Sequence, residues 1–473
     1  MSHITDYLRL HADGKADQAA IIFENKTITW AELWQQVEQT SFYFTEKLGA
    51  KDQQVVNLLM TNSIDFVVVY LAVLQAGHIA LPMDPAYKKL EIDALIQRIP
   101  PSMVVTEERY LPNIGSHTQP VILAAELLKQ WRPAGEPLRL SAKKQIASLT
   151  FTSGTSGSPK TVPNTHSNHI WNIKTCSKVW NWTSQDSLLL NLPLSHMHGL
   201  VMGLSGIIYH GNTLFLHQQS FDAKVILEAL SSGKISMFTH VPLAYMKMLQ
   251  APGDYDLSAV RLCISGAAPL PPPVWHEFKD RFGIEILETY GSTETGRIAG
   301  NRLGKRVLGS PGKVLPGVDL KLSADSEVLV KSGGVFPGYW HNAKATKESL
   351  TDDGYWRTGD IAELKNGYVF LKGRKQEKIR RFGYSISPRD IEWAMHKNPA
   401  VKEIYVMGVQ TQQADDELIY FIVTDLTDQQ IEEYCKQNLL FAWRPSRIIR
   451  LPEIPRTRSG KPMMGTLKEM VAS

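Results

Sequence analysis

Cysteine is scarce in this sequence: Cys176, Cys263 and Cys435 stand far apart in a chain of 473 residues. None of them has the spacing of a metal-ligand pair, and three separated cysteines do not make a disulfide framework. A strong excess of one charge is also missing, since the formal net charge is +4. General nucleic-acid binders carry a much larger basic excess, so we expect no nucleic-acid partner.

Long apolar runs are absent as well. The longest covers residues 66–74, about half of the roughly 20 residues that a membrane-spanning helix needs. The N-terminal residues, MSHITDYLRLHADGKADQAA, show neither the basic start nor the apolar stretch of a signal peptide. We therefore expect a cytoplasmic protein with no membrane span.

What the sequence does contain is typical of a globular protein. Hydrophobic residues make up 43% of the chain and charged residues 21%. A chain of 473 residues is longer than one ordinary hydrophobic core supports. We therefore expect a large domain and a smaller one.

Apolar strands and helical segments alternate through most of the chain. KISMFTHVPLAYMKML is typical of a strand followed by a helix, and AVRLCISGAAPLPPPVWHEFKDRFGIEILETYG of a strand, turn, helix and strand. This alternation predicts an α/β fold with mainly parallel sheets flanked by helices. Ligands of such folds bind at the carboxyl ends of the strands.

The pattern changes after about Gly317. Short alternating segments such as VDLKL, EVLVKS and YVFLKGR, separated by turns, predict a β-rich and more antiparallel subregion. From Pro388 onward, two helical segments surround two apolar strands, which indicates a small α+β domain. We predict an N-terminal domain over residues 1–373 and a C-terminal domain over residues 374–473.

The densest cluster of small polar residues is LTFTSGTSGSPK, at positions 149–160, which follows a strand-like segment. Small residues let backbone N–H groups approach an anion, hydroxyls add donors, and a lysine adds positive charge. The spacing differs from that of a Walker A loop. A flexible Gly/Ser linker is the alternative, but linkers usually lack both the preceding strand and the lysine after proline. The candidate phosphate ligands are Thr152, Ser153, Gly154, Thr155, Ser156, Gly157 and Lys160.

This loop resembles the phosphate loop of the superfamily of adenylate-forming enzymes, which includes acyl-CoA synthetases, nonribosomal-peptide adenylation domains and firefly-type luciferases. Further segments match in the family's order: LPLSHMHGL, ISGAAPL, ETYGSTETG, YWRTGDIA, GRKQEKIRRFGYSISPRDIE and PRTRSGKPMM. The resemblance covers the chain from about residue 20 to its end, and it is closest to the stand-alone acyl-CoA synthetases.

The segment ETYGSTETG follows the strand-like IEILE and so falls at a strand end. The resemblance implies that Tyr290 stacks on adenine, that Gly291 and Ser292 belong to the nucleotide site, and that Thr293 contacts phosphate. Glu294 would hold Mg²⁺, a hard ion that prefers carboxylate and phosphate oxygens. Taken without the resemblance, a polar turn with a solvated glutamate explains the motif equally well.

Further motifs extend this implied nucleotide site. By resemblance, Asp360 accepts hydrogen bonds from both ribose hydroxyls, a role that suits the acceptor sites of a carboxylate. Arg374 is expected near the ribose or the phosphates. Gly266, Ala267 and Ala268 are expected along the adenine and acyl pocket, although close packing of a helix on a strand also explains small residues there.

The same resemblance makes the C-terminal domain a mobile lid joined by a hinge. Lys461 would reach into the large domain and bridge the carboxylate and the α-phosphate, which suits a flexible ammonium group. Without the resemblance it would be an ordinary solvated lysine. Gln376 occupies the hinge position, where Asp or Lys is usual in the family. Gly383 would line the tunnel for the pantetheine arm of CoA.

The acyl pocket is the least defined part of the site. His196 is expected near the acyl and phosphate groups, whereas a packed histidine is an equal alternative for His198. The segment GLVMGL after it offers apolar walls. Arg297 follows Thr-Gly directly and is a candidate to bind a second polar group of the substrate, with a solvated loop as the alternative. We expect a small or medium organic acid that is polar at its far end.

These features predict an AMP-forming acid–thiol ligase of the acyl-CoA synthetase type, a class that serves fatty acid metabolism among other pathways. An organic or fatty acid and ATP with Mg²⁺ give acyl-AMP and pyrophosphate, and CoA then takes the acyl group. A phosphopantetheinyl carrier protein is the alternative acceptor, and a non-catalytic nucleotide-binding regulator is the alternative of another class. Retention of Glu294, Asp360, Arg374 and Lys461 favours the enzyme. The identity of the acid and the formation of a homodimer stay open.

Overall fold

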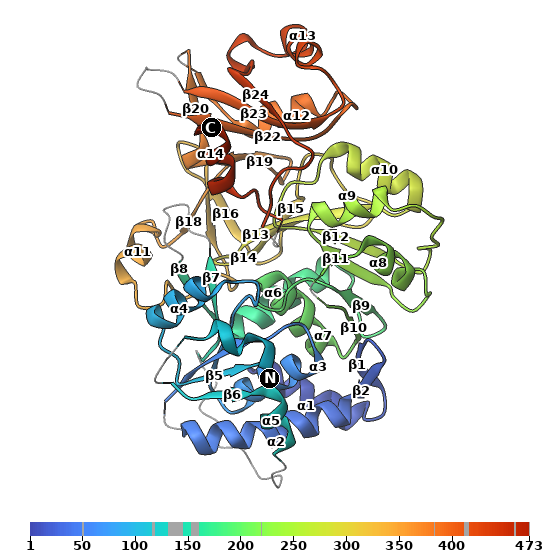
Figure 1. The fold of residues 1–473 in the computed structure, drawn as a ribbon, viewed down its shortest axis with the longest axis vertical. Coiled ribbons are helices and arrows are strands. Elements are labelled where there is room, and N and C mark those ends of the chain that lie inside the picture. The colour runs from blue at the N-terminus through green and yellow to red at the C-terminus, as the bar shows by residue number, and fades with distance from the viewer. Residues whose placement is uncertain are drawn as a thin grey trace.

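The computed structural model describes residues 1–49, 52–115, 119–130, 145–152, 160–218, 220–382, 384–410, 416–457 and 460–472. Figure 1 shows a large lower part, coloured from blue to light orange, and a smaller upper part in orange and red. The chain thus forms a large and a small part that lie one above the other.

A 13-stranded sheet runs through the large part. Six neighbouring strands of it are parallel, in the spatial order β13-β12-β11-β9-β10-β1. The predicted parallel α/β architecture is therefore confirmed, and the carboxyl ends of these strands meet at one edge. The strands are β1 (Ala19–Phe23), β9 (Ser187–Leu190), β10 (Thr213–Leu216), β11 (Met237–His240), β12 (Leu262–Ser265) and β13 (Ile286–Ser292).

The same sheet continues beyond β13 into antiparallel strands, in the order β14-β15-β19-β18-β17-β16. The predicted β-rich, antiparallel subregion is confirmed, and it extends the large sheet rather than standing apart from it. Its strands are β14 (Gly296–Gly300), β15 (Lys313–Val314), β16 (Asp319–Leu322), β17 (Glu327–Lys331), β18 (Trp356–Lys365) and β19 (Tyr368–Arg374), while β2 (Lys26–Thr29) closes the opposite edge.

A second, six-stranded sheet has the order β6-β5-β3-β4-β7-β8. All its neighbours are parallel except β7 and β8, which form an antiparallel pair on either side of the predicted phosphate loop. The strands are β3 (Val55–Leu59), β4 (Ile79–Pro82), β5 (Met103–Thr106), β6 (Val121–Leu123), β7 (Ile146–Thr152) and β8 (Lys160–Thr165).

Helix α3 (Ile64–Gln75) packs in a core that strands of both large sheets share. Every residue from Phe66 to Gln75 is buried, which explains why its sequence is apolar on all sides instead of amphipathic. Ser63 caps the helix, since its hydroxyl accepts a hydrogen bond from the Phe66 backbone N–H at 3.0 Å. The longest apolar run of the chain is thus an interior helix.

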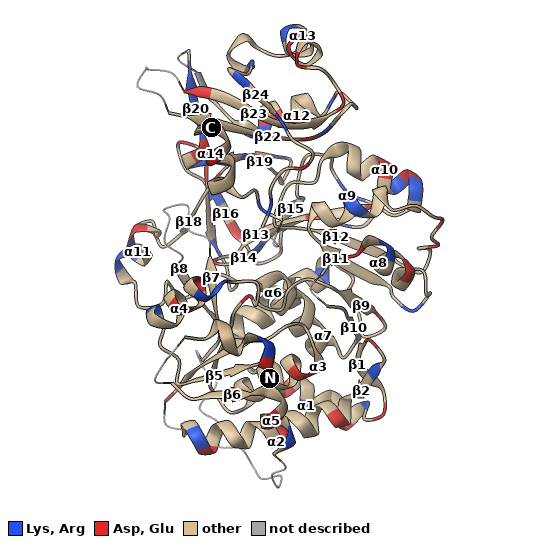
Figure 2. Ribbon diagram, viewed as in Figure 1, with Lys and Arg blue, Asp and Glu red and all other residues tan. Residues whose placement is uncertain are grey.

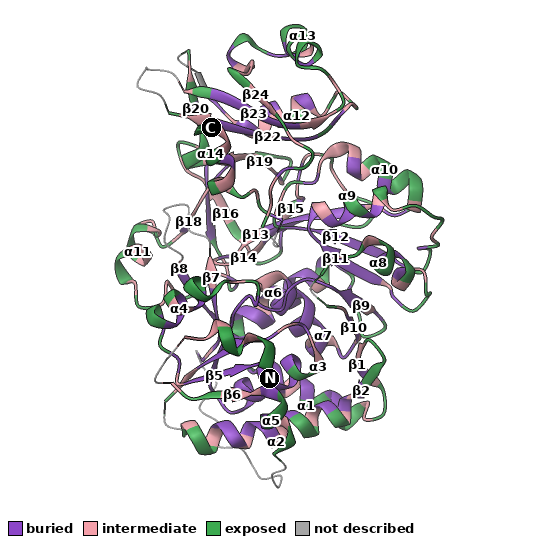
Figure 3. Cartoon of the chain, viewed as in Figure 1, coloured by how far each residue is buried: buried purple, intermediate pink, exposed green. Residues whose placement is uncertain are grey.

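The other helices of the large part cover the sheets from outside or lie beside α3. Figure 3 shows mainly buried strands, whereas α2, α10 and α11 expose much of their surface. The helices are α1 (Ile4–Gly14), α2 (Trp30–Leu48), α4 (Lys89–Arg98), α5 (Ala124–Lys129), α6 (His166–Trp180), α7 (Gly206–His210), α8 (Ala223–Leu230), α9 (Pro242–Gln250), α10 (Pro272–Phe282) and α11 (Ala343–Glu348), with the 3₁₀ turn η1 (Glu108–Asn113) and the π-helix η2 (His198–Ser205).

The small part has its own hydrophobic core, built by a three-stranded sheet and its helices. The predicted α+β composition is confirmed, while the domain boundary between residues 373 and 374 stays a prediction. Its elements are β20 (Ile379–Arg381), β21 (Tyr384–Ile386), β22 (Val401–Val409), β23 (Glu417–Thr424), β24 (Arg447–Arg450), α12 (Pro388–Met395), α13 (Asp428–Asn438) and α14 (Met464–Ala472), with the 3₁₀ turns η3 (Lys375–Glu377) and η4 (Phe441–Trp443).

Side-chain contacts join the small part of the molecule to the large part. The ring of Trp393 on α12 lies against Gly309, 2.9 Å from where a Cβ of that glycine would stand. Nearby, Lys372 Nζ lies 3.0 Å from Asp390 Oδ1.

Basic and acidic segments are interspersed along the ribbon in Figure 2. No helix among the described residues has both the length and the apolar character needed to cross a membrane.

Candidate active site

The carboxyl ends of β11, β12 and β13 bring the predicted nucleotide motifs to one edge of the large sheet. Strand β13 carries Tyr290 and then turns back into β14 through Thr293 and Glu294. The turn depends on glycine. A Cβ on Gly291 would stand 2.1 Å from the carbonyl oxygen of Gly296, and Gly296 itself has a φ of +65°.

Tyr290, Asp360 and Arg374 form a hydrogen-bonded group, which we call the Asp360 cluster. The Tyr290 hydroxyl donates to Asp360 Oδ2 at 2.7 Å, and Arg374 Nε lies 3.0 Å from Asp360 Oδ1. Asp360 and Arg374 are directly opposite each other on β18 and β19. Each carboxylate oxygen keeps a further acceptor site, so the predicted bonds to ribose hydroxyls remain available to Asp360.

The pKa values in the Asp360 cluster follow from these contacts. Burial raises the pKa of Tyr290, and the neighbouring Asp360 carboxylate raises it further. The same carboxylate raises the pKa of Arg374, although burial acts against it. Both side chains therefore keep their protons over the whole physiological range.

Glu294 and Lys160 meet at Tyr339. The Tyr339 hydroxyl donates to Glu294 Oε1 at 3.2 Å, and Lys160 Nζ lies 4.6 Å from the centre of the Tyr339 ring. Thr152 Oγ1 donates to the Lys160 carbonyl at 3.3 Å, which closes the base of the predicted phosphate loop. The loop's remaining candidates, Ser153, Gly154, Thr155, Ser156 and Gly157, lie outside the described residues.

Lys461 comes from the small domain to the same place. Burial and the Arg374 charge lower its pKa, while Glu294 and Asp360 act in the opposite direction. The loop that carries it reaches the large domain, because a Cβ on Gly460 would stand 2.9 Å from Val241 Cγ2. The structure thus brings together the basic and acidic groups that the sequence placed in separate motifs.

Arg456 holds the Lys461 loop to the small domain. Its Nη2 donates to Glu403 Oε2 at 3.0 Å, and its Nη1 donates to the Gly460 carbonyl at 3.1 Å. The Thr457 N–H donates to the Lys461 carbonyl at 2.7 Å. One guanidinium therefore joins strand β22, which bears Glu403, to the residue before the lysine.

Gly266 at the end of β12 lies directly against the predicted acyl site. A Cβ there would stand 3.3 Å from Arg297 Nη1, from His198 Cε1 and from Thr289 Cγ2. The next residue, Ala267, has a left-handed φ of 69°, a conformation that is costly for any residue with a Cβ. Ala268 follows in the same connection to α10.

A narrow pocket opens beside Gly266, and we call it the Arg297 pocket. Its free volume is about 10 Å³, close to the minimum that holds one water molecule. It is lined by Trp180, Trp182, Leu188, His198, Met202, Met237, Thr239, Ile264 and Arg297.

Arg297 is the charged residue of this pocket, and no carboxylate of the described residues forms an ion pair with it. Burial lowers its pKa, yet an arginine side chain stays protonated in proteins. Burial lowers the pKa of His198 far below its usual value, as do the Arg297 charge and His240. The imidazole of His198 is therefore neutral, and its Nε2 lies 2.7 Å from Thr239 Oγ1.

Several polar atoms around the pocket have no hydrogen-bond partner among the described residues. They are His198 Nδ1, His240 Nδ1 and Ser265 Oγ. Buried polar atoms of native proteins are nearly always satisfied, so this region is suited to a polar ligand. His196 lies apart from them, with its Nε2 3.6 Å from Asp84 Oδ2. Gly383 lies outside the described residues.

Some residues of the site were not predicted. Tyr339, Trp180 and Trp182 carry no motif that distinguishes them from ordinary structural residues, and Arg456 lies in the segment PRTRSGKPMM but was assigned no role. Glu403, the partner of Arg456, lies 53 positions away in the sequence. The sequence offered no signal for these contacts, because they form only when distant strands and loops come together.

Comparisons with known proteins give consistent results. The family model of AMP-binding enzymes matches residues 8–340, and that of the AMP-binding enzyme C-terminal domain matches residues 390–461. A 2-succinylbenzoate–CoA ligase of Listeria monocytogenes is 29% identical, over 98% of this chain and 99% of its own. A mitochondrial malonate–CoA ligase of Mus musculus is 28% identical, over 88% of this chain and 81% of its own.

A solved structure matches the fold as a whole. The o-succinylbenzoate CoA synthetase of Bacillus subtilis, in complex with ATP and magnesium ion, has a TM-score of 0.86 and 25% identity. The match covers 98% of this chain and 99% of that one.

Proposed function

Because the chain belongs to the family of AMP-binding enzymes, we propose that it is a CoA ligase for a dicarboxylic acid. The predicted general activity is confirmed by its relatives. It is an AMP-forming acid–thiol ligase that makes an acyl-adenylate with ATP and passes the acyl group to CoA. The proposal concerns the acid and the roles of individual residues.

The observation that carries the proposal is Arg297. Arg297 is partly buried, and a charge withdrawn from water is costly unless an opposite charge compensates it. None of the described carboxylates does so here. A guanidinium binds a carboxylate through two parallel hydrogen bonds. The second carboxylate of the substrate would therefore supply the missing partner. Both related ligases named above act on acids with two carboxyl groups.

In the first half-reaction a carboxylate oxygen attacks the α-phosphorus of ATP. The bond from that phosphorus to the bridging oxygen breaks, and pyrophosphate leaves. Two anions must approach each other, so the site has to supply positive charge. We assign this role to Lys461, together with Lys160 beside the phosphate loop and Arg374 in the Asp360 cluster.

Mg²⁺ would be held by Glu294, and it would neutralise phosphate charge. Glu294 fits that ion because, among the described residues, its Oε1 accepts a hydrogen bond from Tyr339 while its Oε2 accepts none. No cluster of three or more metal-ligating side chains occurs among the described residues. That pattern agrees with Mg²⁺, which usually takes one or two carboxylates and completes its shell with phosphates and water.

In the second half-reaction the thiol sulfur of CoA attacks the acyl carbonyl carbon. The carbon–oxygen bond to AMP breaks, the thiol loses its proton, and AMP leaves. We propose that the small domain moves as a lid between the two steps, about the hinge at Gln376. A carrier protein in place of CoA remains the alternative acceptor to be tested.

The test is ATP–pyrophosphate exchange with the purified protein and a panel of mono- and dicarboxylic acids. Active acids are then supplied with CoA or with a phosphopantetheinylated carrier protein, and the thioester is measured. We expect exchange with dicarboxylic acids and product with CoA. Exchange supported only by monocarboxylic acids would refute the dicarboxylic acid, and absence of exchange with every acid would refute the enzyme.

A further inference from the structure

Two tryptophans, Trp180 and Trp182, line the Arg297 pocket. Trp180 is the last residue of α6, and Trp182 follows after Asn181, which has a left-handed φ of 48°. This turn lets both indoles reach the pocket. Trp180 and Trp182 are buried, with 1% and 5% of their surface exposed, so neither can swing into solvent.

Both rings are held by hydrogen bonds and by packing. Trp180 Nε1 donates to the Asn301 carbonyl at 3.1 Å, and Trp182 Nε1 donates to Asn212 Oδ1 at 2.7 Å. The Trp182 ring stacks on His210 with centroids 5.0 Å apart. It also lies 2.3 Å from where a Cβ of Gly206 would stand, so the glycine makes room for the indole.

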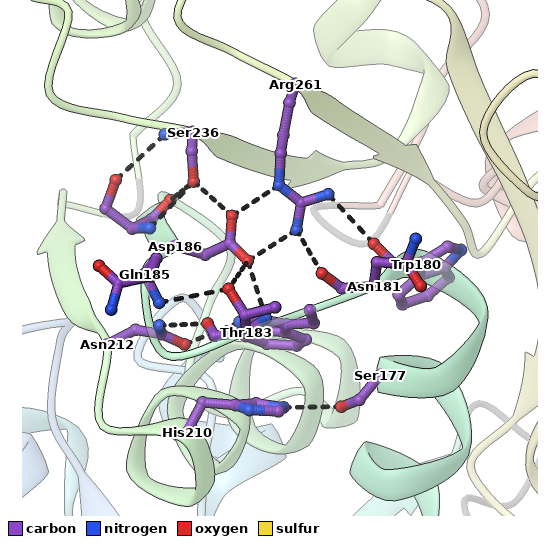
Figure 4. Close-up of polar contacts among 12 residues, drawn as sticks. Ser177, Trp180, Asn181, Thr183, Gln185, Asp186, His210, Asn212, Ser236 and Arg261 are labelled. Atoms are coloured by element: carbon purple, nitrogen blue, oxygen red, sulfur yellow. Dashed lines mark hydrogen bonds and ion pairs between the residues drawn. The ribbon is translucent and has the colours of Figure 1, made fainter.

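The backbone between these tryptophans is fixed by Arg261 and Asp186 (Figure 4). Arg261 Nε donates to Asp186 Oδ1 at 2.7 Å and Nη2 donates to Oδ2 at 2.6 Å. The same guanidinium donates to the carbonyls of Trp180 and Asn181, at 3.1 and 3.0 Å. Such a two-pronged, charge-assisted contact is both strong and directional.

Further hydrogen bonds complete this network, as Figure 4 shows. The Thr183 N–H donates to Asp186 Oδ2 at 2.9 Å, and Ser236 Oγ donates to Asp186 Oδ1 at 2.9 Å. Asn212 Nδ2 donates to the Thr183 carbonyl at 2.7 Å. Burial acts to raise the pKa of Asp186, but the bonds from Arg261, Thr183 and Ser236 outweigh it and lower the pKa. The carboxylate is therefore charged and the segment is rigid.

Arg297 lies close to the nucleotide motif. Arg297 on β14 is directly paired with Gly291 on β13, one residue after Tyr290 of the Asp360 cluster. Paired residues of antiparallel strands have Cα atoms roughly 5 Å apart. Arg297 is therefore one strand away from the nucleotide motif, and its side chain lines the same pocket as the two tryptophans.

We infer that Trp180 and Trp182 form a fixed floor that limits the length of the dicarboxylic acid. The inference rests on the proposed function and adds a limit on substrate length. Trp182 is the specificity-determining residue, because its ring lines the pocket. Arg261 and Asp186 are positioning residues that act through the tryptophans.

The test compares chain-length profiles. Exchange is measured as kcat/KM for malonate, succinate, glutarate and adipate, each beside the monocarboxylic acid of equal carbon number. For the wild type we expect one preferred length and a loss of about 10-fold or more for each further methylene. In Trp182→Leu the optimum should move to acids longer by one or more methylenes. Trp182→Phe, which keeps an aromatic ring, should move it less.

Two further variants separate specificity from stability. Trp34→Leu removes a partly buried tryptophan of α2 from the same large core and should leave the length profile unchanged. Arg261→Lys keeps the charge but loses the two-pronged bond. It should broaden the chain-length profile of kcat/KM and leave KM for ATP unchanged. A general loss of stability would not produce this combination.

Two outcomes are decisive in different ways. Folded Trp182→Leu and Trp182→Phe proteins with the wild-type profile would overturn the floor. A wild type that prefers the monocarboxylic acids, with a profile that still lengthens in Trp182→Leu, would overturn the dicarboxylate and leave the floor in place.

Discussion

In the Asp360 cluster the charged side chains are paired with one another, whereas in the Arg297 pocket the cation has no such partner among the residues that the structure describes. Asp360 is bound by Tyr290 and Arg374 at the same time. Arg297 is enclosed by aromatic and apolar side chains and by a neutral histidine. The two regions differ although Tyr290 of the cluster and Arg297 lie on adjacent strands, β13 and β14.

Each region is therefore suited to a different part of the substrates. Paired groups hold one another in position before a ligand arrives, so the Asp360 cluster is suited to orienting a nucleotide. An unpaired cation instead gains most when its counter-ion comes with the ligand. The Arg297 pocket is therefore suited to selecting among acids by their charge. The substitutions below test whether the Asp360 cluster orients the nucleotide and the Arg297 pocket selects the acid.

The largest effect is expected for Lys461→Ala. Loss of one charged group that stabilises a developing anion typically costs about 100- to 1,000-fold in rate, and we expect that loss in ATP–pyrophosphate exchange. Lys468→Ala, an exposed lysine on α14, is the matched control and should keep wild-type exchange. Equal exchange by the two variants would show that the position of Lys461 beside Arg374 and Glu294 has no catalytic meaning.

A smaller effect is expected for Arg297→Ala, and it should depend on the acid. Hydrogen bonds to charged groups contribute about 1.5–3 kcal/mol, so kcat/KM for a dicarboxylic acid should fall about 10- to 100-fold. The monocarboxylic acid of the same length should be affected far less. Arg302→Ala, at an exposed position, controls for the change in net charge. A uniform loss across both acids would remove the distinction between the two regions.

Arg456→Lys should have a weaker effect, about 10-fold on exchange, because it loosens the loop without removing Lys461. Acyl transfer to CoA from a presynthesised acyl-adenylate should be retained, since no two anions meet in that step. Glu403→Gln weakens the same contact from its other side. It should likewise lower exchange and leave acyl transfer to CoA unchanged. If both half-reactions fall together, Arg456 acts on the fold and not on the lysine.

The smallest effect on catalysis is expected for Glu392→Gln on α12. Burial raises the pKa of Glu392 to about 7, so this carboxyl group can become neutral by binding a proton. Arg297 has no such route, because an arginine side chain does not release its proton in proteins. Between pH about 4.5 and about 7 the folded state binds more protons than the unfolded state, so stability falls as pH rises. The variant should remove that slope in urea unfolding at pH 5 and pH 8, with exchange unchanged. A slope that persists would assign it to another group.

Much of the fold followed from local patterns. The alternation around β11, β12 and β13 predicted parallel strands, and the apolar run over residues 66–74 was judged too short for a membrane-spanning helix. The residues of the Asp360 cluster were found through the resemblance to a family, because each stands in one of its motifs. Proximity of Lys461 to that cluster also followed, through the resemblance to a family.

The walls of the Arg297 pocket could not be predicted in the same way. Trp180, Trp182, Met237 and Thr239 come from different strands and turns, and each resembles an ordinary core residue when read in sequence. Arg297 was considered together with a solvated loop as its alternative. Only the packing of β14 against α6 shows that it is enclosed, because burial depends on contacts between distant segments.

The most direct test is a crystal structure of the enzyme with AMP and a short dicarboxylic acid, or with the corresponding acyl-adenylate. We predict that an oxygen of the far carboxylate lies about 2.7–2.9 Å from the guanidinium of Arg297, with the chain ending above Trp182. A far carboxylate that points to solvent, while a protein carboxylate or a phosphate contacts Arg297, would contradict the account.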